Sequence, residues 1–112
     1  MFSFIILHYK NIDETIECLT KLQNLFKNKC HIIIVDNNTL SKSEEKLIQK
    51  FTKDVLKLDK NYGFAKANNK GIAYAREKYK SKYYIVMNND VYIDDENFLN
   101  IIEQDYKKYS FD

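Results

Sequence analysis

Residues 83–95 read YYIVMNNDVYIDD, where a run of aromatic and branched apolar residues changes abruptly into two amides and a carboxylate. The apolar residues 83–87 have no alternating polar positions, which is typical of a strand covered on both faces in a parallel sheet. Asn88, Asn89 and Asp90 follow the carboxyl end of that strand. Because ligands of open α/β sheets bind beyond such ends, Asp90 is a candidate ligand residue. The alternative is a solvated turn that leads into a capped helix.

Three further apolar runs predict strands at residues 2–7, 31–35 and 55–58. The run at 31–35 is followed by Asp36 and Asn37, two residue types that favour turns and bond to neighbouring backbone. Polar side chains therefore follow the carboxyl end of this strand as well.

Helices are predicted between the strands, where apolar residues recur at three- and four-residue spacing. Asn11 is the expected cap of the first helix, and Ser41 with Glu44 has the spacing of a capping box before the second. An alanine-rich helix is predicted over about 64–79, and a final amphipathic helix over 98–106.

Four strands alternating with four helices imply right-handed crossovers and a parallel sheet. We therefore predict an α/β fold, a Rossmann-like three-layer sandwich whose mostly parallel sheet has the strand order 3-2-1-4. In that order the polar ends of three strands converge on one crevice. These ends are His8, Tyr9 and Lys10 after the first strand, Asp36 and Asn37 after the second, and Asn88, Asn89 and Asp90 after the fourth.

Length and composition limit the class of protein. At 112 residues the chain is one domain, small for a complete two-substrate enzyme. Its net charge of +2 comes from interspersed acids and bases, so no nucleic-acid partner is expected. Cys18 and Cys30 do not have the short spacing of paired metal ligands. We expect both to be reduced thiols that pack among apolar neighbours, in a cytoplasmic protein. The first ten residues resemble neither a signal peptide nor a membrane span; a peripheral position at the inner face of the membrane is left open.

The converging residues suit a nucleotide. Tyr9 can stack on a base, Asp36 or Asn37 can pair with a base edge, and Asp90 can hold a divalent cation that bridges phosphates. No G-x-G-x-x-G follows the first strand and no Walker lysine motif occurs, which removes support for dinucleotide and P-loop proteins. Phosphate charge would then be met largely by a metal.

Four segments carry a resemblance to a known family: FIILHYKN, IIIVDNN, NYGFAKANNKGI and YYIVMNNDV. In this order and spacing they resemble the signature blocks of the nucleotide-sugar-binding half of family 2 glycosyltransferases of the GT-A fold. The last two blocks are most similar to members that use uridine (UDP) or deoxythymidine (dTDP) diphosphate sugars, including rhamnosyltransferase-like enzymes. The resemblance covers nearly the whole chain.

The resemblance implies roles for individual residues. Tyr9 would lie against the base, and Asp36 and Asn37 would approach the base or ribose. Residues 88–90 would be a variant of the family's D-x-D motif, in which Asp90 binds manganese or magnesium. Asn88 replaces the usual first aspartate; this change removes a negative charge but leaves an amide that can bond ribose or phosphate. Asn89 would belong to the same nucleotide site.

The resemblance also implies the reaction, an inverting transfer of a sugar from a nucleotide diphosphate to a saccharide or lipid-linked acceptor. Residues 1–112 would be the nucleotide-sugar-binding half of a GT-A domain, a partial GT-A fold. The acceptor half and the catalytic carboxylate lie downstream in the family, so the catalytic residue is unknown and this chain alone is expected to be inactive. Without that half, the strand at 83–87 would have an exposed edge through which the chain self-associates.

Two other classes of protein stay open. The first is a non-catalytic nucleotide-binding remnant or module, which would fold and bind but transfer nothing. The second is a receiver-like signalling domain, which also places aspartates at strand ends. That domain needs an acidic pair after the first strand, where Leu7, His8 and Tyr9 stand, so the sequence favours it least.

Overall fold

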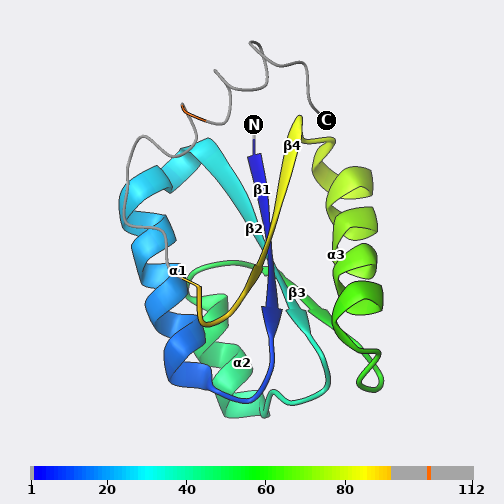
Figure 1. Ribbon diagram of the computed structural model, residues 1–112. Coiled ribbons are helices and arrows are strands. Elements are labelled where there is room, and N and C mark those ends of the chain that lie inside the picture. Colours follow the sequence, from blue (N-terminus) through cyan, green and yellow to red (C-terminus); the bar gives the residue numbers. More distant parts are fainter. Residues whose placement is uncertain (1, 92–100, 102–112) are drawn as a thin grey trace.

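The computed structural model describes residues 2–91 and 101, and in this part strands and helices alternate along the chain (Figure 1). The elements are β1 (Phe2–His8), α1 (Ile12–Phe26), the short 3-10 helix η1 (Lys27–Lys29), β2 (Cys30–Asp36), α2 (Lys42–Gln49), β3 (Asp54–Lys57), α3 (Phe64–Tyr79) and β4 (Tyr83–Asn88). All four predicted strands are confirmed within one residue at each end. The helix predicted over 98–106 lies outside the described residues, except for Ile101, which is helical.

The four strands form one parallel sheet in the order β3-β2-β1-β4, which confirms the predicted order 3-2-1-4. β1 lies at the centre and pairs with β2 from Phe2 opposite Cys30 to His8 opposite Asp36. On its other side Leu7 lies opposite Asn88 of β4. The carboxyl ends of β1, β2 and β4 are therefore level with one another, at one edge of the sheet.

Helices cover both faces of the sheet, as predicted for a three-layer sandwich. Figure 1 shows α1 and α2 on one face and α3 on the other. Residues of β1 alternate between the two resulting cores: Phe4 and Ile6 face α1 and α2, and Ile5 and Leu7 face α3. All four side chains are buried, and each contributes about 1.5–3 kcal/mol through removal of apolar surface from water.

The predicted caps position the first two helices. The Asn11 side-chain oxygen accepts a hydrogen bond from the backbone N–H of Glu14 at 3.2 Å. Ser41 and Glu44 form a complete capping box, in which each side chain accepts a hydrogen bond from the other residue's backbone N–H. Both helices consequently begin just beyond the strand end that precedes them.

A polar cluster at the opposite edge of the sheet attaches β3 to the end of α3. The buried Asp54 carboxylate accepts hydrogen bonds from the Tyr74 hydroxyl at 2.9 Å, the Lys78 ammonium at 2.5 Å and the Tyr79 hydroxyl. Burial opposes the charged form of Asp54, but these donors hold its pKa below the ordinary value. The His31 ring stacks on Tyr79, with 3.6 Å between ring centroids. This cluster was not predicted from the sequence.

Both cysteines are free thiols, as predicted. Cys18 lies on the buried face of α1, and Cys30 is half-buried at the start of β2. Burial raises the pKa of each thiol to about 11, so both are protonated and unreactive near neutral pH.

β4 is less covered than the sequence predicted. Met87 is buried, but Val86 is 37% exposed and Tyr84 and Ile85 are only half-buried. The expectation of full cover on both faces is wrong for Val86, because this side chain lies beside Ile5 on the α3 face, and α3 packs mainly over β1 and β2.

The predicted self-association through this edge stays a prediction. An unpaired apolar strand offers backbone donors and acceptors to a second chain, so we expect a concentration-dependent dimer. Sedimentation velocity over a range of concentrations measures it. A strictly monomeric chain at the highest concentration would contradict the prediction.

α3 packs on the sheet unusually closely at Gly71. A Cβ atom at this position would lie 2.5 Å from Ile5 Cγ2 and 2.6 Å from Val35 Cγ2. Both methyl groups branch directly from Cβ in buried strands and have little freedom to move aside. Gly71 therefore sets the distance between α3 and the sheet.

We expect Gly71→Ala to lower the free energy of unfolding by about 1–3 kcal/mol, the usual cost of overpacking a core. Chemical denaturation of both chains measures the change. The matched control is Ala73→Gly, at an exposed position of the same helix, which should cost about 1 kcal/mol through helix propensity alone. A Gly71→Ala chain as stable as the wild type, or more stable, would show that the sheet yields to the extra methyl group.

Candidate functional site

A crevice of about 440 Å³ opens at the carboxyl ends of β1, β2 and β4, next to the start of α3. Five of the six predicted site residues line it, and the exception is Asp36. The loop before α3 and the first turn of α1 complete the wall. The lining residues are Leu7, Tyr9, Glu14, Asn37, Asn61, Gly63, Phe64, Asn88, Asn89 and Asp90.

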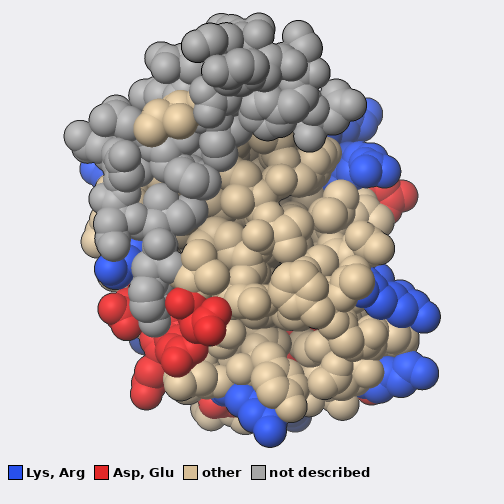
Figure 2. All heavy atoms as spheres, in the orientation of Figure 1, with Lys and Arg blue, Asp and Glu red and all other residues tan. Residues whose placement is uncertain are grey.

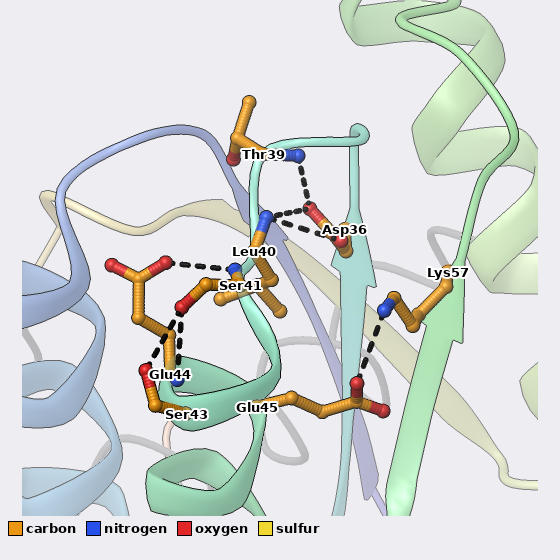
Figure 3. Close-up of polar contacts among 8 residues, drawn as sticks. All are labelled: Asp36, Thr39, Leu40, Ser41, Ser43, Glu44, Glu45 and Lys57. Carbon is orange, nitrogen blue, oxygen red and sulfur yellow. Dashed lines mark hydrogen bonds and ion pairs between the residues drawn. The ribbon is translucent and has the colours of Figure 1, made fainter.

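The Asp36 carboxylate points into the loop after β2 (Figure 3). It is 1% exposed, and it accepts hydrogen bonds from the backbone N–H of Thr39 at 2.8 Å and of Leu40 at 3.2 Å. Figure 3 also shows the Ser41 and Glu44 capping box directly after this loop. Asp36 thus shapes the turn between β2 and α2, and its predicted approach to a base or ribose stays a prediction.

The loops after β1 and β2 are joined to each other. The backbone N–H of Lys10 donates to Thr39 Oγ1 at 3.0 Å. Lys10 and Asn38 both have left-handed backbone, with φ of 65° and 70°, which is uncommon for residues with a side chain. The turns that follow β1 and β2 are therefore tight, and the hydrogen bond between Lys10 and Thr39 holds them together.

Asn37 fixes the loop that precedes α3. Its side-chain amide donates to Asn61 Oδ1 at 2.8 Å, and its own oxygen accepts from the backbone N–H of Tyr62 at 3.0 Å. Asn61 Oδ1 also accepts from the backbone N–H of Gly63, which has φ of 82° and caps α3. Asn37 lines the crevice but is buried, so its amide positions residues 61–63.

Asn89 fixes the turn after β4 in the same way. Its amide donates to Asn11 O at 3.2 Å and to Thr15 Oγ1 at 3.0 Å. Thr15 Oγ1 also lies 2.6 Å from His8 Nδ1. His8 was expected at the polar edge of the crevice; the structure corrects this, because His8 is the last residue of β1 and its ring is fully buried beneath α1.

The exposed side chains that line the crevice are aromatic, amide and carboxylate. Tyr9 is 44% exposed, with the Lys10 ammonium 5.0 Å from its ring centroid, and Phe64 is 54% exposed. Asn88 and Asp90 are also exposed. Phe64 was not predicted as a site residue. Its spacing from the buried Ala67, Asn68 and Gly71 places it on the buried face of α3, so the sequence pattern predicts a packing residue and contains no signal that Phe64 lines the crevice.

The side chains at the end of β4 suit a cation that is bound partly by the protein and partly by substrate phosphates, rather than one bound by protein ligands alone. Among residues 2–91 and 101, no three His, Cys, Asp or Glu side chains come together as metal ligands. Magnesium, however, is commonly bound by one or two carboxylates and completes its coordination with substrate phosphates and water. One carboxylate, Asp90, and one amide, Asn88, fit that pattern.

A larger hollow of about 610 Å³ lies at the opposite edge of the sheet, between the end of α1 and the starts of β2 and β3. It contains none of the predicted site residues. Its carboxylate, Asp54, already accepts hydrogen bonds from two tyrosines and a lysine. The crevice is therefore the better candidate for a functional site.

A sequence model described as Glycosyl transferase family 2 matches residues 3–110. The chain belongs to this family. The match confirms the family resemblance stated from the four sequence blocks, whereas the rhamnosyltransferase-like subgroup stays a prediction. No curated protein matches the chain at a significant level.

Each of the four blocks that resemble family 2 glycosyltransferases contributes to the crevice. The first block supplies Tyr9, the second Asn37, the third Asn61 with its neighbours, and the fourth Asn88 to Asp90. Segments far apart in the sequence therefore meet at one site in this family 2 chain.

The buried His8 makes the stability of the site edge depend on pH. Burial lowers the pKa of His8, an effect that the nearby Asp36 and Glu44 charges oppose without reversing. The unfolded chain, in which His has a pKa of about 6.5, then binds a proton more readily than the folded chain. The contribution of His8 is therefore complete above about pH 6.5 and is lost as the pH falls from there toward the folded pKa.

We expect the free energy of unfolding to decrease as the pH is lowered from 8 to 5, and His8→Asn to remove part of that slope. Chemical denaturation across the pH range measures both chains. Asp54 does not interfere, because its hydrogen-bond donors hold its pKa below the ordinary value of an aspartate, which already lies below this pH range. Burial also lowers the pKa of His31, so His31→Asn should remove a separate part of the slope and keep the His8 contribution. A His8→Asn slope equal to that of the wild type would contradict the assignment.

Proposed function

We propose that residues 1–112 form the nucleotide-sugar-binding half of a GT-A glycosyltransferase domain, and that the crevice binds the nucleotide diphosphate of a UDP or dTDP sugar. The observation that carries this proposal is the presence of an exposed aromatic, Tyr9, and an exposed carboxylate, Asp90, in one crevice of a family 2 chain. An aromatic ring can stack on a base, and a carboxylate can hold the cation that bridges phosphates, so the two groups suit the two ends of one nucleotide.

The base is assigned to the end of the crevice that carries Tyr9. An exposed ring can stack on a base without a specific edge contact, and such stacking is typically worth about 1–3 kcal/mol. Phe64 offers a second exposed ring among the lining residues. The tight turns held by Asp36 and Asn37 would keep this wall in place before the nucleotide arrives, which lowers the cost of ordering it on binding.

The diphosphate is assigned to the end of β4. Asp90, with the Asn88 amide beside it, would hold magnesium or manganese together with phosphate oxygens. A bound cation would stabilise negative charge on the leaving diphosphate. The chain itself would position Asp90. The side-chain amide of Asn89 donates hydrogen bonds to Asn11 and Thr15, and these bonds hold the turn from which Asp90 extends.

The reaction proposed is inverting transfer of the sugar to a saccharide or lipid-linked acceptor, as in polysaccharide biosynthesis, by a cytoplasmic protein peripheral to the membrane. A carboxylate would have to deprotonate the acceptor hydroxyl, a contribution of about two to four orders of magnitude in rate. No described residue is assigned to that role. A non-catalytic nucleotide-binding module is the second candidate, and it is favoured by the single carboxylate at the end of β4. Acceptor-dependent release of nucleotide diphosphate would separate the two.

UDP should bind at least about tenfold more tightly with manganese than with a chelator present, a difference of about 1.4 kcal/mol. Asp90→Asn should remove that difference, because it removes the only carboxylate that the proposal gives to the cation. Isothermal titration calorimetry of both chains in both conditions measures it. Because Asp90 is exposed, its replacement should leave the thermal midpoint of unfolding unchanged.

Two further variants sharpen the experiment. Glu77→Gln replaces an exposed carboxylate on α3, outside the crevice lining, and should keep the manganese dependence. Tyr9→Ala should weaken UDP binding by about 1–3 kcal/mol with and without manganese, and Tyr9→Phe should restore it. Equal UDP affinity with manganese and with chelator in the wild type would remove Asp90 from the metal role.

A further inference from the structure

Three lysines surround one tyrosine beside the crevice. The ammonium groups of Lys60, Lys66 and Lys70 lie 5.2, 5.2 and 4.8 Å from the centroid of the Tyr62 ring. We call these four residues the Tyr62 cluster. All three lysines are exposed, and none of them forms an ion pair within the described part of the chain.

The cluster belongs to a strongly basic side of the molecule. Residues 60–82 contain seven of the chain's 18 lysines and arginines and only one of its 16 acids, Glu77. Figure 2 shows Lys and Arg gathered along the edge formed by α3, whereas Asp and Glu gather at the lower left, where α1 lies. The nearly balanced net charge of the chain therefore hides a local excess of positive charge along α3.

The positive charge is in excess of what the fold uses. Lys78 is bound to Asp54, but Lys66 and Lys70 extend from the exposed side of α3, and Arg76 and Lys80 continue the basic surface along that helix. One acid, Asp59, lies beside the cluster: its carboxylate accepts a hydrogen bond from the Tyr62 hydroxyl, and its charge also interacts with Lys60 and Lys70, so it offsets only part of the three positive charges. Three ammonium groups around one ring repel one another, so an anionic partner would be attracted to them.

The shape of the surface favours an extended anionic partner over a small anion. None of the three lysines lines either cavity in the described residues, so the cluster is an open surface and does not enclose a ligand. Tyr62 lies at its centre, and the exposed ring of Phe64 is two residues further along the chain. Clustered lysines with adjacent exposed aromatics are the combination that binds an anionic lipid surface.

We propose that the Tyr62 cluster docks on the anionic surface of a membrane. The lysine ammonium groups would meet lipid phosphates, while Tyr62 and Phe64 lie at the level of the headgroups. No helix in the described part of the chain has the length and apolar character needed to cross a bilayer. The contact proposed is therefore with the membrane surface.

Docking by this face would bring the crevice to the membrane, because Gly63 and Phe64 line the crevice and adjoin the cluster in the chain. This consequence deepens the proposed function and rests on it only for the lipid-linked acceptor. The lipid contact itself is tested without nucleotide. Failure of one proposal is therefore distinguishable from failure of the other.

The test is co-sedimentation of the full chain with vesicles of phosphatidylcholine alone and of phosphatidylcholine mixed with phosphatidylglycerol. We expect binding to the mixed vesicles at low salt, weakening as salt is added, and none to phosphatidylcholine. The triple variant Lys60→Gln, Lys66→Gln, Lys70→Gln should bind on the order of a hundredfold more weakly. Circular dichroism and thermal unfolding of each chain confirm that it is folded.

The matched control is the triple variant Lys42→Gln, Lys46→Gln, Lys50→Gln, which removes the same charge from exposed positions of α2 and its end. It should bind nearly as well as the wild type. Equal loss in both triple variants would mean that net charge alone drives binding, and would overturn the proposal. Absence of binding to the mixed vesicles, or tighter binding to a single-stranded RNA oligonucleotide at the same salt, would overturn it as well.

Discussion

The parallel pairing of β1 with β2 on one side and with β4 on the other sets the height of the strand ends, and the crevice depends on that alignment. His8 lies opposite Asp36 and Leu7 opposite Asn88, so the first polar residues beyond three strands emerge side by side. A shift of one residue in either pairing would turn the apolar side chains of a strand to the opposite face. The two cores on either side of β1 contain different side chains, so such a shift would exchange residues between them, and packing thereby contributes to the geometry of a polar site.

The polar residues beyond the strands divide into two groups with different tasks. Asp36, Asn37 and Asn89 are buried and bond to the backbone or to side chains of neighbouring loops. Tyr9, Asn88 and Asp90 are exposed. Buried groups of the first kind must be satisfied, because an unpaired buried polar group costs about 1–3 kcal/mol. That requirement makes the turns rigid, so the exposed groups already face the crevice in the unliganded chain.

The sequence predicted the strands, the three described helices and the strand order, because apolar spacing and helix caps are local signals and parallel connections have one hand. The sequence also predicted that Tyr9, Asn37 and the end of β4 lie at one edge of the sheet. It could not predict which way a polar side chain points: Asp36 and Asn37 are adjacent, yet only Asn37 lines the crevice. Nor could it place His8 in the core or assemble the Asp54 cluster, since both depend on contacts between segments distant in sequence.

The segment from β3 to the start of α3 is attached at both ends by hydrogen bonds, which involve charged groups at one end and neutral groups at the other. At one end Asp54 is an anion bound to a lysine ammonium and two tyrosine hydroxyls, and at the other Asn37 and Asn61 join through neutral amides. Acid and dissolved ions act on a charged attachment and hardly at all on a neutral one. The two ends of this segment therefore unfold locally under different solution conditions. Acid loosens β3 from α3 at the far edge of the sheet, whereas the loop at the crevice keeps its amide hydrogen bonds.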